Sequence, residues 1–254
     1  MLEDAFTAGL VKRGDLYITS KLWNHQHRPA DVRACLEERL RLLRVDYLDL
    51  FLMHWPVAFR KATYNVQKHA SDPWFHEPDD VPIVETWRAM EALVREGRVR
   101  AIGVSNFSVS QLRALLDVAE IPPVTNQVEC HPYFAQNELL ALCRARGCTL
   151  TAFSPLGKPG LLLPGQPNLL EDPVVRGIAA KHGRQPSQVV LRWNMQRGVR
   201  VIPKSTTRAR ILENFAVEGF ALDAADMAAI DGLDRNLRLV NPHWVVFDTE
   251  TRLK

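Results

Sequence analysis

The stretch YLDLFLMH (47–54) decides the expected fold of this chain of 254 residues. It is almost continuously apolar, which is typical of a strand buried on both faces of a parallel sheet. An amphipathic helix is predicted before it, over 29–43, and another after it, from Ile83 to Gly97. Strands that alternate with helices in this way predict an α/β fold with a parallel sheet.

The same alternation continues along the chain and predicts six strands in all. The other five are expected at 16–23, 99–104, 124–128, 149–153 and 199–203. Further helices are expected over 2–12, from Ser108, from Leu139 to about Gly147, from Pro173, from Pro186, and over 207–215 and 223–232. Neither a break in composition nor a linker separates these elements, so residues 1–254 are predicted to form a single domain.

The predicted strands all end on polar residues, namely Lys21, His54, Ser105-Asn106, Asn126-Gln127, Ser154 and Lys204. In a parallel barrel these ends meet on one face, where the active site is built. A lysine is costly to bury unpaired, so Lys21 indicates a carboxylate partner or a catalytic role. His54 alone would be explained as a core histidine, but the neighbouring Lys21 favours a function.

Lys204 begins a second polar cluster, because Ser205 and two threonines follow it, and Arg208 and Arg210 then enter a predicted helix. Free backbone N–H groups at a helix start, together with cationic side chains, bind anions. Taken alone, the pattern fits a phosphate site and a solvated basic turn equally well. The chain has no GxGxxG and no GxxxxGK[ST] motif, which argues against a Rossmann site and a P-loop.

Composition narrows the class of protein. The net charge is only +3 and acidic residues lie among the basic ones, which disfavours nucleic-acid binding. No apolar run approaches the ~18 residues that a membrane span needs, and the N-terminus has no signal h-region, so a cytoplasmic protein is expected.

Cys130, Cys143 and Cys148 are predicted to be buried thiols. His25 and His27 are expected to be solvated loop histidines, and no metal site is predicted.

Two aromatic segments lie outside the predicted strands and helices. The long loop 55–82 carries Trp55, Phe59, Tyr64, Trp74 and Phe75, and the tail carries His243, Trp244 and Phe247. Such residues line an apolar substrate pocket or simply pack together, and the first interpretation is favoured because the loop follows His54.

Several motifs, in order along the chain, resemble the aldo-keto reductases. They are ITSKLW (18–23), Asp46-Tyr47-Leu48-Asp49 leading to MHWP (53–56), GVSNF (103–107), NQVECHP (126–132), FSPLG (153–157) and IPKS (202–205) with Arg210, Glu213 and Asn214. The resemblance covers essentially the whole chain. It implies a (β/α)8 TIM barrel that binds NADP(H) across the C-terminal ends of its strands, without a Rossmann domain.

The resemblance also implies which residues bind the cofactor. Ser105, Asn106 and Gln127 would hold the nicotinamide carboxamide, and Phe153 stands where the family usually has a stacked tyrosine. The remaining positions would be Ser154 and Leu156 at the pyrophosphate, Lys204, Ser205 and Arg210 at the adenosine 2′-phosphate, and Glu213 and Asn214 near the adenine.

The implied chemistry is NADPH-dependent reduction of an aldehyde or ketone to an alcohol. His54 would orient the carbonyl, Trp23 and Trp55 would line the substrate pocket, and Lys21 would lower the pKa of a proton-donating tyrosine together with an aspartate. In the family, that tyrosine and aspartate precede the strand that carries the lysine. Since 2–12 resembles the helix after the tyrosine, the family's first two strands are expected to be absent from these residues.

Three hypotheses therefore remain open. The chain is a carbonyl reductase by descent whose sequence here is short at the N-terminus, a catalytically inactive NADP(H)-binding or interaction protein, or a truncated chain that does not fold stably. A substitute proton donor would have to be Tyr64 or Tyr133, because Tyr17 and Tyr47 lie at strand beginnings. Neither the individual substrate nor the oligomeric state is predicted.

Overall fold

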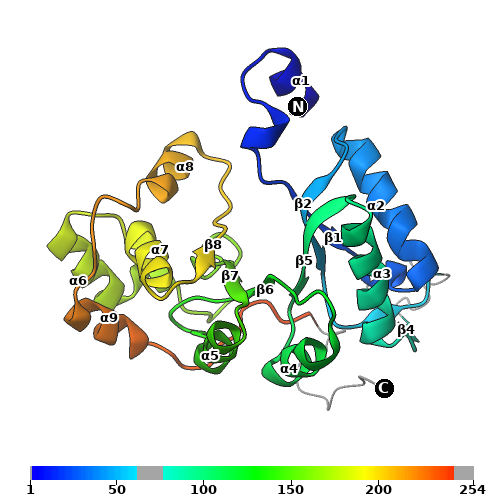
Figure 1. Cartoon of the computed structure of the whole chain (residues 1–254). Coiled ribbons are helices and arrows are strands. Elements are labelled where there is room, and N and C mark those ends of the chain that lie inside the picture. Colours follow the sequence, from blue (N-terminus) through cyan, green and yellow to red (C-terminus); the bar gives the residue numbers. More distant parts are fainter. Residues whose placement is uncertain (1, 62–76, 243–254) are drawn as a thin grey trace. The chain divides into compact units, whose positions relative to one another are not determined.

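The computed structural model describes residues 2–61 and 77–242 (Figure 1). In this part of the chain, the six predicted strands form one sheet in the order β1-β2-β5-β6-β7-β8. Their bounds are β1 Thr19–Leu22, β2 Leu48–Met53, β5 Val99–Ser105, β6 Thr125–Glu129, β7 Thr149–Phe153 and β8 Arg200–Val201. The pairs β1–β2, β2–β5 and β7–β8 are parallel, which confirms the α/β prediction.

The predicted helices are also present. Their bounds are α1 Leu2–Thr7, α2 Pro29–Leu43, α3 Ile83–Arg95, α4 Val109–Val118, α5 Asn137–Ala145, α6 Pro173–His182, α7 Pro186–Gln196, α8 Arg208–Phe215 and α9 Ala224–Asp231. The helix predicted over 2–12 ends early, because Gly9 adopts a left-handed conformation with φ 65°. The loop predicted at 55–82 contains a short antiparallel pair, β3 Ala58–Phe59 and β4 Pro78–Asp79.

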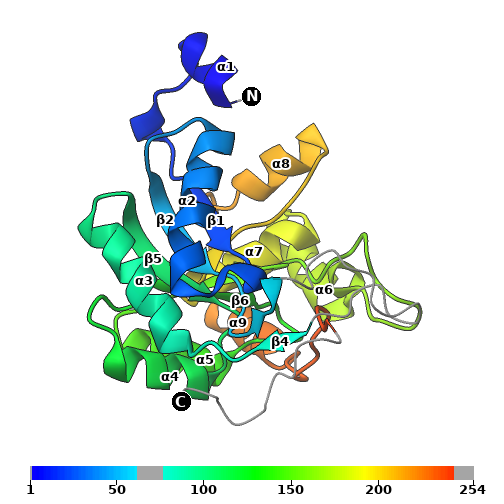
Figure 2. The ribbon, with the colours of Figure 1, turned by 90° about the vertical axis from the view of Figure 1, so that its right-hand side faces the viewer.

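The described residues fall into two compact units, which are considered separately. The single-domain prediction therefore stays a prediction. In the first unit, which holds 1–126, β2 is buried along its whole length, as its apolar sequence predicted. Figure 2 shows α2 and α3 lying along the β1, β2 and β5 strands. Trp87 of α3 and Phe51 of β2 are among the largest fully buried side chains.

The second unit, residues 127–241, has its own apolar core. Val189, Val190 and Trp193 of α7 pack in it with Tyr133 and Leu169. Asp172 caps α6 by accepting a hydrogen bond from the backbone N–H of Val174. Helix α7 therefore contributes several of the side chains that form this core.

Other sequence predictions can be checked in the described residues. The capping box of α4 is formed, since the Ser108 hydroxyl accepts from the Gln111 backbone and the Gln111 side chain accepts from the Ser108 backbone. Cys130, Cys143 and Cys148 are free and buried, as expected, and so is Cys35. No helix in this part of the chain is long and apolar enough to cross a membrane.

Candidate active site

In the first unit the structure brings Lys21, His54, Trp23 and Trp55 together. Lys21 lies in β1 opposite Leu52 of β2, and the backbone N–H of His54 donates to the carbonyl of Leu22 at 3.0 Å. The Trp23 ring meets the His54 imidazole edge-on at 4.9 Å between centroids. The Trp55 ring stacks beside it at 6.2 Å. The ends of two adjacent parallel strands thus place the His54 imidazole against two indole rings, and the charge of Lys21 acts on that imidazole.

Burial controls the charge of this cluster. Burial lowers the pKa of Lys21, which forms no ion pair among the residues that the structure describes. Burial and the charge of Lys21 lower the pKa of His54 to about 4. The imidazole is therefore neutral at pH 7, so it has one N–H donor and one acceptor nitrogen. A neutral N–H suits a hydrogen bond to a carbonyl oxygen.

The end of β5 contributes Ser105 and Asn106. The Asn106 Nδ2 donates to the backbone carbonyl of His54 at 2.9 Å and to the Ser105 Oγ at 3.2 Å. Asn106 has φ 63°, a left-handed conformation that asparagine tolerates better than most residues. Its Oδ1 is buried and has no hydrogen-bond partner among the residues that the structure describes. A buried acceptor without a partner is costly, and a ligand N–H donor would satisfy it.

The second unit contains a cavity of about 840 Å³. It is lined by seven predicted cofactor residues: Ser154, Leu156, Lys204, Ser205, Arg210, Glu213 and Asn214. They come from the turn after β7, the segment after β8 and helix α8. Residues distant in sequence therefore form one surface, as the resemblance implies.

The cationic side of this cavity suits an anion. Lys204 and Arg210 are exposed, and neither forms an ion pair within 2–61 and 77–242. The N-terminus of α8 has no side-chain cap, so its first backbone N–H groups can donate hydrogen bonds to an anionic ligand. Just before the helix, the Ser205 Oγ accepts from the N–H of Thr207 at 3.2 Å. These features are compatible with a phosphate site, and its assignment to Lys204, Ser205 and Arg210 stays a prediction.

The turn after β7 is strained in two places. Ser154 and Lys158 have φ of 46° and 54°, in the left-handed region that non-glycine residues rarely adopt. Such strain often accompanies a binding site. Lys158 also lines the cavity, and its Nζ donates to the carbonyl of Leu239 at 3.4 Å. Lys158 was not predicted as a site residue, although the Pro/Gly-rich composition of 157–168 indicates an irregular loop.

Like Ser105 and Asn106, the predicted cofactor residues Gln127 and Phe153 do not line the cavity. Gln127 is buried in β6, and Phe153 lies half-buried at the end of β7. Their assignment to the nicotinamide therefore stays a prediction.

Tyr64 and Tyr133 are the two candidates for a substitute proton donor. The hydroxyl of Tyr133 donates to the Asp172 Oδ2 at 2.8 Å, and the Arg235 guanidinium lies 3.7 Å from its ring centroid. Burial and Asp172 raise the pKa of Tyr133 to about 12, which makes it a poor acid at neutral pH. The Tyr133 hydroxyl is therefore engaged with Asp172, and the hypothesis that Tyr133 donates the proton stays a prediction. Tyr64 lies outside the described residues.

The aromatic loop and tail are only partly covered. Trp55 and Phe59 are buried, which fits packing as well as a pocket. The other predicted pocket residues, Tyr64, Trp74, Phe75, His243, Trp244 and Phe247, lie outside the described residues.

The histidine pair at 25–27 was expected to be solvated. His27 is instead fully buried, because η2 (Asn24–Gln26) packs into the first unit. In the described part of the chain, no group of three His, Cys, Asp or Glu side chains is placed to hold a metal ion.

Comparison with known proteins identifies relatives of the chain. The model of the Aldo/keto reductase family matches residues 1–235. The chain is 48% identical to "Aldo-keto reductase family 1 member A1" of Bos taurus over 93% of its own length and 73% of that protein. The proteins of the same name from Rattus norvegicus and Homo sapiens are 47% and 46% identical, over 95% and 96% of this chain and 74% and 75% of theirs.

Proposed function

Because the chain belongs to the aldo-keto reductase family, oxidoreductases with a (β/α)8 barrel, we propose that it reduces an aldehyde or ketone with NADPH. Bound NADPH would supply the hydride. The observation that supports this most directly is the cavity of the second unit, where Lys204 and Arg210 lie without carboxylate partners among the described residues.

The cavity residues would bind the adenosine half of the cofactor. Lys204, Ser205 and Arg210 would hold the 2′-phosphate, because two cations and a hydroxyl at a helix start match its charge and its acceptor oxygens. Ser154 and Leu156 would lie along the pyrophosphate. Glu213 and Asn214, half-buried on α8, would contact the adenine.

The first unit would hold the reacting carbonyl. The neutral His54 would donate an N–H to the carbonyl oxygen, and the ring faces of Trp23 and Trp55 would exclude water. The orphaned Oδ1 of Asn106 would accept from the carboxamide of the nicotinamide, with Ser105 and Gln127 as its other ligands. Phe153 would stack on the ring.

A second candidate is an NADP(H)-binding protein that does not turn over. It is favoured by the tyrosines of the described residues: Tyr17 is exposed, Tyr47 lies between the guanidiniums of Arg13 and Arg100, and Tyr133 is bonded to Asp172. Lys21 also has no ion pair within this part of the chain.

Cofactor titration tests the phosphate site. Lys204→Met and Arg210→Met should each weaken NADPH binding about 10- to 100-fold, since a hydrogen bond to a charged group contributes roughly 1.5–3 kcal/mol. NADH lacks the 2′-phosphate, so its affinity should barely change. Arg176→Met is the matched control, because Arg176 is an exposed arginine of α6 outside the cavity. Equal losses of affinity for NADPH and NADH would contradict the assignment of Lys204 and Arg210 to the 2′-phosphate.

Turnover separates the two candidates. NADPH consumption with a reactive aromatic aldehyde, abolished in Lys21→Met, would establish the reductase. A folded chain that binds NADPH with no turnover would establish the second candidate.

A further inference from the structure

Helix α7 carries three polar side chains at four-residue intervals that bond to the backbone of 213–222. We call Gln188, Arg192 and Gln196 the α7 ladder. Side chains spaced by four residues lie along one face of a helix. Arg192 Nη1 donates to the carbonyl of Val217 at 3.5 Å, and Gln196 bonds both backbone groups of Leu222 at 2.7 and 2.9 Å. The ladder therefore runs from α8 to the start of α9.

Gln188 is the member that reaches α8 itself. Its Nε2 donates to the carbonyls of Glu213 at 3.2 Å and Ala216 at 2.8 Å. Its Oε1 accepts from the backbone N–H of Gln185 at 3.0 Å, which caps α7. The side chain is only 6% exposed. In the described part of the chain, these are the only side-chain hydrogen bonds from another element to α8 and to its C-cap residue Ala216.

Helix α8 has little else to fix its position. None of its eight residues is buried, and Ile211, Leu212 and Phe215 are 50%, 58% and 87% exposed. Burial of an apolar face normally holds a surface helix in place. For α8, the two bonds from Gln188 to its last turn take a large part of that role.

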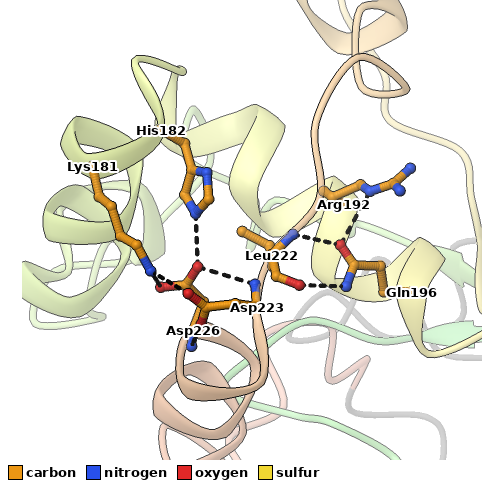
Figure 3. Close-up of polar contacts among 7 residues, drawn as sticks. All are labelled: Lys181, His182, Arg192, Gln196, Leu222, Asp223 and Asp226. Atoms are coloured by element: carbon orange, nitrogen blue, oxygen red, sulfur yellow. Dashed lines mark hydrogen bonds and ion pairs between the residues drawn. The ribbon is translucent and has the colours of Figure 1, made fainter.

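The far end of the ladder is anchored separately (Figure 3). Lys181 Nζ lies 2.6 Å from Asp223 and 2.8 Å from Asp226, and His182 Nε2 lies 2.7 Å from Asp226. The N-terminus of α9 is therefore held to α6 by charges, and Gln196 holds Leu222 beside it. The segment is fixed beyond α8, so loss of the Gln188 bonds would free α8 more than α9.

We propose that Gln188 is a positioning residue that fixes α8 so that Arg210 can reach the cofactor 2′-phosphate. This inference rests on the proposed function. Arg210 lies in the first turn of α8, the same short helix that contains Glu213, and the second carbonyl that Gln188 bonds belongs to Ala216, the C-cap of that helix. Selectivity for NADPH over NADH thus depends on a side chain from another helix.

Two substitutions separate the roles of Gln188. Gln188→Glu keeps an acceptor for the Gln185 N–H but loses the donor to α8, whereas Gln188→Ala loses both. Each should weaken NADPH binding about fivefold or more and NADH binding less than twofold. The reason is that each lost hydrogen bond lowers the affinity a few-fold. Gln196→Ala is the control, expected to lower Tm with an unchanged ratio of NADPH to NADH affinity.

The outcomes distinguish this inference from the proposed function. If Arg210→Met lowers the NADPH/NADH ratio and Gln188→Glu does not, the positioning role is wrong and the phosphate site stands. If Arg210→Met has no effect, the phosphate site itself is wrong. If the Gln188 variants do not fold, backbone amide hydrogen exchange of the unmodified protein tests the positioning role of Gln188 instead. Adenosine 2′-phosphate should slow exchange at the Ala216 and Val217 amides, and unchanged exchange there would overturn the proposal.

Discussion

His54 should make the stability of the protein depend on pH between 8 and 5. Burial, and then the charge of Lys21, lower its pKa from 6.5 in the unfolded chain to about 4 in the folded one. Because the folded value is depressed, the unfolded chain binds the proton first. The full stability is therefore present above pH 6.5 and is lost as the pH falls towards 4.

The size of the effect follows from the two pKa values. At pH 5 the unfolded imidazole is almost fully protonated, 1.5 pH units below its midpoint, while the folded imidazole of His54 stays mostly neutral. At 1.36 kcal/mol per unit, His54 alone removes about 2 kcal/mol of stability between pH 8 and pH 5. His27, whose pKa is lowered to about 3 by burial and by His25, adds a similar loss.

Urea unfolding followed by tryptophan fluorescence measures this loss. The fall in unfolding free energy from pH 8 to pH 5 should be about 2 kcal/mol smaller in His54→Gln than in the unmodified protein. His27 is present in both proteins, so its contribution cancels. Lys21→Met should show a slightly smaller fall than the unmodified protein, because one cause of the shift is gone. Equal falls in His54→Gln and the unmodified protein would refute the argument that His54 is held neutral.

Two further predictions concern the framework of the site. Asp226→Asn should destabilise the protein by about 1–2 kcal/mol at pH 7. Burial raises the pKa of Asp226, but the hydrogen bonds from Lys181 and His182 outweigh the effect of burial, so that the pKa falls to about 2. Because this folded pKa is depressed below 3.8, the difference from the unmodified protein should shrink in urea unfolding as the pH falls from 4 towards 2, and a constant gap would count against it. Gly103→Ala in β5 should lower stability by about 1–3 kcal/mol, because an added Cβ would lie 2.8 Å from the Thr125 carbonyl oxygen, and an unchanged Tm would contradict this.

Much of the fold could be predicted because its signals are local. The apolar run of β2, the prolines at the first positions of α2, α6 and α7, and the capping box at Ser108 each act within a few residues. The strand ends were predicted for the same reason, and they gave Lys21, His54 and Lys204 as candidates. The lengths of β1 and β8 were overestimated, since the extent of a strand depends on its pairing with a neighbour.

The sequence by itself determined the order of strands and helices and the polar residues at the strand ends, because apolar periodicity and capping are written in neighbouring residues. Only the tertiary structure decided that Tyr133 bonds Asp172, that Lys158 lines the cavity, and that Gln188 holds α8. Each of these contacts joins residues from different elements. The packing of helices on the sheet determines which polar groups come within hydrogen-bond distance, and no local pattern in the chain encodes this proximity.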